Sequence, residues 1–131
     1  MQEYTFRGKH KKTGKMVYGK LYHFCDVSAC IYSDDLDKPM WVDPKTVGQF
    51  TELTDEDGKR IFEGDIVEPV LTGGTHNGFP WGKQMVVFDR GAFCLKDRRG
   101  EITPMCNYAA NVQFKVLGNI HDNPELLEVS E

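Results

Sequence analysis

The sequence predicts an all-β or β-rich fold. Two observations support this prediction: short runs of β-branched and aromatic residues recur between clusters of Gly, Asp and Asn, and no window carries a long 3.6-residue apolar period. With 131 residues, 40% hydrophobic and 27% charged, the chain has the size and composition of one water-soluble domain. Within this single domain we expect an N-terminal β-hairpin region over residues 1–47, a small SH3-like barrel over residues 48–120 and a C-terminal capping turn over residues 121–131.

The first strands are predicted from apolar runs and from the turn between them. Residues 4–7 and 16–24 are rich in aromatic and β-branched side chains. Residues 12–15 (KTGK) have the chemistry of a hairpin turn, because Gly14 is free to adopt a positive φ. Further strands are expected at residues 29–33, 47–51, 65–68 and 113–120, and a hairpin at residues 86–95 with its tip at residues 89–91.

Short helical turns are expected where a capping residue precedes proline. Asp43 is followed by Pro44, and Asp122 is followed two residues later by Pro124. Proline is favoured at the first helical position after a capping side chain. Between two apolar runs, the Asp-Gly pair at residues 57–58 is a strong turn signal. We therefore expect a helical turn after Asp43, a tight turn at 57–58 and a short helix near the C-terminus.

The formal net charge of −4 is distributed unevenly along the chain. The first 20 residues hold six Lys or Arg and one acid, whereas the last eleven hold four acids and no Lys or Arg. An acidic chain is not typical of a duplex-DNA-binding protein, although such asymmetry can steer a charged partner. No run approaches the roughly 20 apolar residues of a membrane span, and the first residues lack the apolar stretch of a secretory signal. We therefore expect a cytoplasmic protein without membrane contact.

The four cysteines are predicted to be free thiols. Cys25 and Cys30 are separated by four residues and Cys94 and Cys106 by eleven, so neither pair forms the close knuckle of a structural zinc site, even with His23 nearby. No cysteine has sequence neighbours that would clearly lower its pKa, and no Gly-x-Ser-x-Gly motif is present. The sequence therefore predicts no catalytic residue, no metal and no cofactor.

The segment 69–82 is the first candidate for partner binding. It contains four glycines and two prolines, and loops of this length are often functional. His76, Phe79 and Trp81 are the candidate contact residues, because exposed aromatic side chains often anchor a partner. The alternative is that the two aromatic rings fold back on the core.

The sequence Glu63-Gly64-Asp65 has two interpretations. Paired carboxylates can hold a metal ion or share a proton, so Glu63 and Asp65 are candidates for metal-dependent hydrolysis of a phosphoester or nucleotide. The other interpretation is a structural bend that enters the strand at residues 65–68, where the aspartate satisfies local N–H groups. We favour the bend.

A further alternative function is the binding of single-stranded nucleic acid. Small β barrels combine basic grooves with aromatic stacking surfaces, and Tyr4 and Tyr18 would supply rings. The candidate nucleic-acid contacts are Arg7, Lys9, Lys11, Lys12, Arg98 and Arg99.

Four short blocks of sequence are distributed over nearly the whole length of the chain. They read FRG at 6–8, VDPKTVGQFT at 42–51, GKRIFEGDIV at 58–67, and VLGNI at 116–120 continued by NPELL at 123–127. In this order, the blocks resemble the YopX proteins of bacteriophages and prophages. The resemblance implies a phage or prophage gene, a cytoplasmic product in a bacterial host and a compact β fold, and it carries no catalytic or binding residues.

The leading function hypothesis is a phage or prophage accessory protein that binds a host or phage macromolecule and is not an enzyme. It rests on the missing catalytic motifs, on the resemblance and on the aromatic, glycine-rich segment 69–82. Nucleic acid is the less favoured partner, and the hydrolase is the enzymatic alternative. Self-association into a homo-oligomer is left open.

Overall fold

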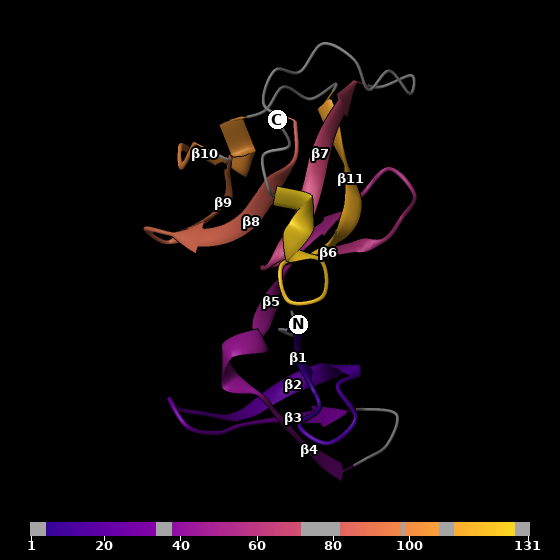
Figure 1. Cartoon of the computed structure of the whole chain (residues 1–131), viewed down its shortest axis with the longest axis vertical. Coiled ribbons are helices and arrows are strands. Elements are labelled where there is room, and N and C mark those ends of the chain that lie inside the picture. The colour runs from indigo at the N-terminus through magenta and orange to yellow at the C-terminus, as the bar shows by residue number, and fades with distance from the viewer. Residues whose placement is uncertain (1–4, 34–37, 72–81, 98, 108–111, 128–131) are drawn as a thin grey trace. The chain divides into compact units, whose positions relative to one another are not determined.

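The computed structural model describes residues 5–33, 38–71, 82–97, 99–107 and 112–127. These residues form antiparallel strands and short 3-10 helices (Figure 1). The chain divides into two compact units, residues 1–50 and 51–131, and β5 runs from the first into the second. The elements are β1 (Phe6–Lys9), β2 (Met16–Phe24), β3 (Ala29–Ser33), β4 (Lys38–Val42), η1 (Pro44–Thr46), β5 (Gly48–Thr54), β6 (Arg60–Phe62), β7 (Asp65–Leu71), β8 (Gln84–Asp89), β9 (Ala92–Lys96), β10 (Ile102–Pro104), η2 (Met105–Asn107), β11 (Val112–Asn119) and η3 (Pro124–Leu127).

The first unit is built on an antiparallel sheet with the strand order β4-β3-β2-β1-β5. Alternation along β2 places Leu21 in the core, whereas Tyr18 and Lys20 are exposed. An isolated bridge pairs His10 with Val42, so the end of β1 lies beside the end of β4. The core consists of Ala29, Ile31 and Val42, with Phe6, Val17, Leu21 and Val47 packed against them.

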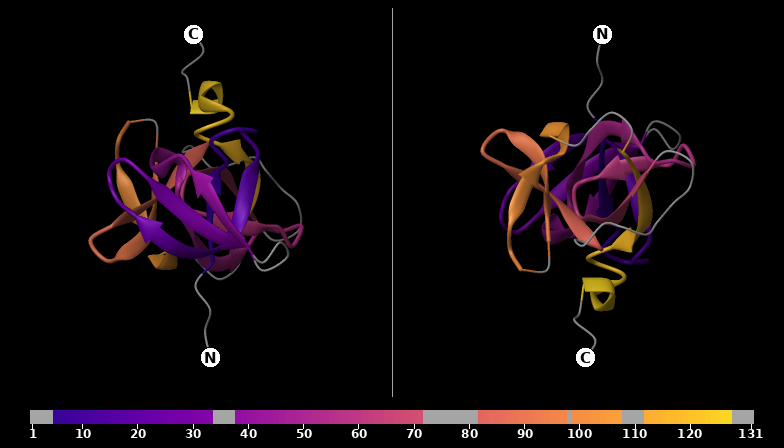
Figure 2. Two further views of the ribbon diagram at one scale, coloured as in Figure 1. Left: turned by 90° about the horizontal axis from the view of Figure 1, so that it is seen from below. Right: turned by 90° about the horizontal axis from the view of Figure 1, so that it is seen from above.

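The second unit contains the end of β5, β6 and a five-stranded antiparallel sheet with the order β10-β9-β8-β7-β11. Figure 2 shows β9 and β10, in orange, at one edge of this sheet. Ile61 of β6 packs against Val67, Val86 and Leu95 of the sheet, so burial of apolar surface holds β6 against one face. The pairing of β11 with β7 shifts register after Val116, which marks a β-bulge. Met105 and Phe114 complete the core cluster.

The SH3-like barrel predicted for residues 48–120 is not confirmed. In the described part of this range the strands belong to two antiparallel sheets that do not close into a barrel. The strand predicted at residues 47–51 pairs with β1, where Phe6 lies opposite Gln49. Alternation along a sequence predicts a strand, but it does not predict which distant strand becomes its neighbour.

Several predicted elements are confirmed. β2 and β3 have the predicted bounds, and the hairpin of β8 and β9 turns at Arg90 and Gly91, both with positive φ. The helical turn after Asp43 is η1, and the Asp43 carboxylate accepts a hydrogen bond from the Lys45 N–H at 3.0 Å. The C-terminal helical turn is η3. Local capping and turn chemistry therefore predicted these positions correctly.

Three strands were not predicted, β4, β6 and β10, and two of them contain a proline. Pro39 lies in β4 and Pro104 in β10, and each strand ends the strand order of its sheet. A proline has no N–H for the ladder, so it is found in edge strands and weakens the strand signal in the sequence.

The described cysteines are free thiols, as predicted. Cys30 and Cys94 are buried, Cys25 is half-buried and Cys106 is exposed. Among the described residues, no helix is long and apolar enough to cross a membrane.

Candidate functional site

The predicted site residues fall in different parts of the chain. His76, Phe79 and Trp81 lie outside the described residues, and so does Arg98. Their role in binding stays a prediction. The remaining candidates lie in both units: Arg7, Lys9, Lys11 and Lys12 in the first, Glu63, Gly64, Asp65 and Arg99 in the second.

The segment Glu63-Gly64-Asp65 forms a bend between β6 and β7. Gly64 has φ of +94°, a conformation that strains any residue with a side chain. The Asp65 side chain is 2% exposed, and its carboxylate accepts a hydrogen bond from the Phe62 N–H at 2.8 Å. The Asp65 carboxylate thus binds the backbone of Phe62 and stabilises the bend that leads into β7. Among the described residues, no group of three or more His, Cys, Asp or Glu could hold a metal ion.

The basic candidates of the first unit differ in exposure. Arg7 on β1 is 5% exposed, so its side chain is largely removed from solvent. Lys9 is half-buried, and Lys11 and Lys12 are exposed in the turn between β1 and β2. Arg99 lies in the turn between β9 and β10. Lys9 and Lys11 line one hollow, Lys12 follows in the same turn, and the side chain of Arg7 is buried.

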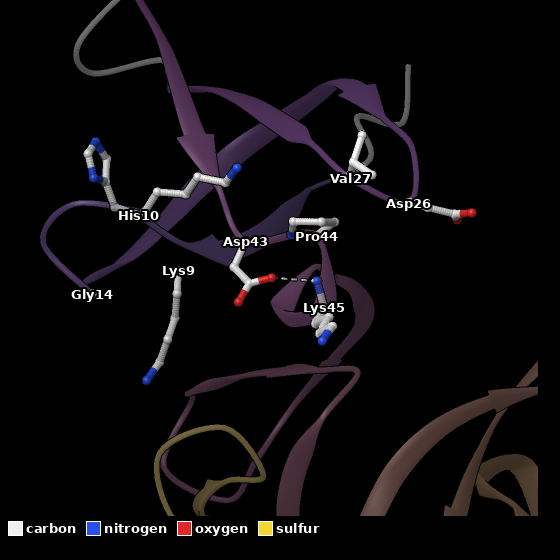
Figure 3. A pocket seen from close by; sticks show the side chains of 9 residues that line it. Lys9, His10, Gly14, Asp26, Val27, Asp43, Pro44 and Lys45 are labelled. Carbon is white, nitrogen blue, oxygen red and sulfur yellow. Dashed lines mark hydrogen bonds between the residues drawn. The ribbon is translucent and has the colours of Figure 1, made fainter.

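A hollow of about 500 Å³ lies where the β1–β2 turn, the β2–β3 turn and η1 meet (Figure 3). Asp43 lines this hollow and is held by two hydrogen bonds: its N–H donates to the Lys9 carbonyl at 2.9 Å, and its carboxylate accepts from the Lys45 N–H. Thr46 adds a second link, because its hydroxyl accepts from the Lys9 N–H at 2.8 Å. The lining is Lys9, His10, Lys11, Gly14, Asp26, Val27, Asp43, Pro44 and Lys45.

The outer face of the first unit's sheet carries a row of rings that we call the aromatic band: Tyr22, His23, Tyr32 and Trp41. Tyr22 and Tyr32 have ring centroids 6.2 Å apart at 55°, and His23 and Trp41 have centroids 6.2 Å apart at 69°. Tyr22 is 74% exposed and Trp41 51% exposed. Cys30 is paired with both His23 and Trp41 on the neighbouring strands, so it lies between them, and it is buried.

Lysines adjoin the aromatic band on two sides. Lys20 on β2 lies directly opposite Tyr32 on β3. At the other end, the Lys11 N–H donates to the Trp41 carbonyl at 3.0 Å, so the β1–β2 turn lies against β4. The band thus lies between Lys20 and the basic turn that also lines the hollow.

A polarised thiol lies in the β2–β3 turn beside the band. The Ser28 hydroxyl lies 3.4 Å from the Cys25 sulfur and 3.0 Å from the His23 Nε2. The hydrogen bond from Ser28 lowers the pKa of the Cys25 thiol to about 7, and backbone hydrogen bonds of the same turn act in the same direction. By contrast, burial raises the pKa of the thiols of Cys30 and Cys94. Sequence reasoning expected no thiol with a lowered pKa, because the partners come from the folded turn.

Comparison with known protein families shows which family this chain belongs to. The family described as YopX protein matches residues 5–128. The chain belongs to the YopX family. Among solved structures, the crystal structure of protein EF1440 from Enterococcus faecalis is similar in fold, with 21% identity, a TM-score of 0.60, and coverage of 98% of this chain and 100% of that one. Comparison with curated proteins finds no match.

In this YopX protein, sequence reasoning missed the aromatic band. Trp41 was not placed because β4 was not predicted, and Tyr32 could not be paired with Tyr22 without the register of β2 and β3. One signal was present: polar and aromatic residues alternate with apolar ones from Val17 to Tyr22, which indicates an outward-facing row of side chains. Chemically, rings beside lysines can bind flat or anionic groups.

Proposed function

We propose that this YopX protein is a phage or prophage accessory protein that binds a host or phage macromolecule in the cytoplasm of the bacterial host and is not an enzyme. The observation that carries the proposal is the exposure of aromatic side chains on the first unit. Five of the eight exposed large hydrophobic residues in the described part of the chain belong to it: Tyr18, Tyr22, Phe24, Val27 and Trp41.

Exposed rings of this kind support binding rather than folding. Burial of a large side chain contributes about 1.5–3 kcal/mol to stability, and a ring that is half or more in water forgoes much of it. Tyr and Trp are also the side chains that contribute most at protein recognition surfaces. Trp41 and Tyr22 are therefore the first residues we expect a partner to cover.

The enzymatic alternative, a hydrolase that uses Glu63 and Asp65, has less support than the binding function. A general base or metal ligand must reach its substrate, whereas the Asp65 carboxylate is buried and bonded to the Phe62 N–H. The resemblance to phage and prophage proteins supports the origin but implies no activity. His76, Phe79 and Trp81 remain a second candidate surface for the same partner.

The test is partner capture with matched variants. The immobilised full chain is exposed to an extract of the bacterial host, and retained proteins and nucleic acids are both identified. Trp41→Ala and Tyr22→Ala should lose the retained partner. Phe88→Ala should keep it, because Phe88 in the second unit is also 51% exposed but lies outside the aromatic band. Retention of the same molecules by all three variants would refute the proposed surface.

A further inference from the structure

We infer that the macromolecule bound by the aromatic band is a single-stranded nucleic acid, with bases stacked on Trp41 and Tyr22 and phosphates met by Lys11, Lys12 and Lys20. This inference rests on the proposed function and names the chemical class of its partner. Proteins that bind single strands combine aromatic stacking surfaces with a positively charged track along the backbone. The rings and Lys20 lie on this face, and the turn that carries Lys11 and Lys12 adjoins it.

The ring geometry leaves π-faces open. The His23 and Trp41 planes meet at 69°, and the Tyr22 and Tyr32 planes at 55°, so neither pair is stacked face to face. A ring that meets its neighbour at such an angle keeps a face for a further flat group. With Trp41 51% and Tyr22 74% exposed, these two rings can each accept a base. The bases of a duplex are already stacked, so the rings require a single strand.

The charge distribution favours an anionic partner on this unit. Residues 1–50 hold eight Lys or Arg against six Asp or Glu, a net charge of +2, whereas residues 51–131 hold eight against fourteen, a net charge of −6. Lys20 lies across from Tyr32, and Lys11 is bonded through its backbone to Trp41. Lys12, the next residue, is also exposed. A strand that crosses the band therefore passes Lys20 at one end and the exposed turn that carries Lys11 and Lys12 at the other.

A peptide partner that adds a strand to β4 fits less well. Strand addition needs a free ladder of backbone N–H and C=O groups at the sheet edge. Pro39 removes one donor from β4, and the Trp41 carbonyl is already bonded to the Lys11 N–H. The outward side chains of β4, rather than its backbone edge, are the accessible feature, and this favours recognition by stacking.

The inference is tested with the purified full chain and a fluorescein-labelled 12-nucleotide strand, as poly-dT and as poly-U, followed by fluorescence anisotropy at low salt. Trp41→Ala and Tyr22→Ala should each weaken binding about tenfold, a change within the range for loss of one stacked base. Phe88→Ala should leave the affinity unchanged. Circular dichroism must show that all variants are folded.

Salt dependence gives an independent readout. The logarithm of the association constant should fall with the logarithm of salt concentration by about 0.7 for each phosphate contact. Lys11→Gln should reduce that slope by about 0.7, whereas Lys59→Gln in the second unit should not change it.

Absence of binding at low salt, equal losses for Trp41→Ala and Phe88→Ala, or preference for a duplex would overturn the inference. If the oligonucleotides fail while the captured partner from the host extract still depends on Trp41, the nucleic-acid inference alone fails. If capture fails as well, the proposed function fails with it.

Discussion

Asp55 is the residue whose removal should most weaken the second unit. Its side chain is 7% exposed and accepts three backbone hydrogen bonds: Oδ1 from the N–H groups of Asp57 and Lys59 at 2.9 and 2.8 Å, and Oδ2 from the Val116 N–H at 3.0 Å. The last bond joins the β5–β6 turn to β11 beside its bulge. One carboxylate thus stabilises a turn and a strand that lies about 60 residues away in the chain.

A second turn in the same protein provides the control. Asp97 repeats the local pattern: its Oδ1 accepts the N–H groups of Arg99 and Glu101 at 2.8 and 3.0 Å, and its backbone N–H donates to the Glu101 carbonyl at 3.0 Å. In Asp55 the corresponding N–H donates to the Lys59 carbonyl at 2.7 Å. Both Asp97 side-chain bonds are exposed, and in the described part of the chain no third hydrogen bond to the Asp97 carboxylate is found.

The expected difference follows from the bonds that each variant removes. A hydrogen bond to a charged group contributes about 1.5–3 kcal/mol, and a buried N–H left without an acceptor costs about 1–3 kcal/mol. For Asp97→Ala, water can replace the carboxylate, so we expect a loss of about 1 kcal/mol in the free energy of unfolding. For Asp55→Ala we expect about 3–4 kcal/mol, because the Val116 N–H also loses its acceptor. Asp55→Asn keeps one acceptor oxygen and should lose about 2 kcal/mol.

The assay is urea unfolding followed by far-UV circular dichroism, with linear extrapolation of the free energy. The difference between the free-energy losses of the two alanine variants is the decisive quantity, because the shared effect of removing a turn aspartate cancels in it. If Asp55→Ala and Asp97→Ala cost the same within about 0.5 kcal/mol, the cross-strand bond to Val116 contributes nothing and the reasoning is wrong.

Three further predictions concern the backbone and the polarised thiol. Gly64→Val should cost more than about 2 kcal/mol in thermal unfolding, because a β-branched residue is forced to φ of +94°, and an unchanged melting temperature would contradict this. Gly19→Ala should destabilise by about 2 kcal/mol or more, since its Cβ would press on backbone of the adjacent β3, whereas Gly14→Ala, with nothing within 4 Å, should lose only about 1 kcal/mol. Alkylation of Cys25 by iodoacetamide should rise with pH through a midpoint near 7, because the thiolate is the reactive form. Ser28→Ala should move that midpoint upward, and a midpoint that does not move would show that Ser28 is not the cause.

The parts of the fold that the sequence predicted are those decided by neighbours along the chain. Asp43 before Pro44 predicts η1 because the capping side chain and the fixed proline φ act within three residues. Asp57-Gly58 predicts its turn for the same reason, and Gly58 has φ of +83°. Bends of this kind require no knowledge of the remainder of the chain, so they can be read from a single sequence.

The parts that were missed depend on contacts between distant residues. The barrel prediction failed because the pairing of β5 with β1 and of β7 with β11 is decided by side-chain packing, which alternation alone does not specify. The aromatic band was not predicted for a related reason. Its rings come from β2, β3 and β4, and the β2–β3 register contains a shift between Leu21 and His23. That bulge puts Tyr22 and His23 on the same face, which a strict period of two would forbid.

The residues that identify the family and the residues that we assign to binding are different sets. Asp43, Gly58, Gly64 and Asp65 lie in the blocks that resemble YopX proteins, and in the structure they cap a helical turn, make positive-φ turns and hold the entry to β7. They stabilise backbone and are not part of the aromatic band. The rings of the band lie outside those blocks, on the outer face of three strands. Family membership therefore specifies the scaffold of this chain, and its partner has to be sought through Trp41 and the rings beside it.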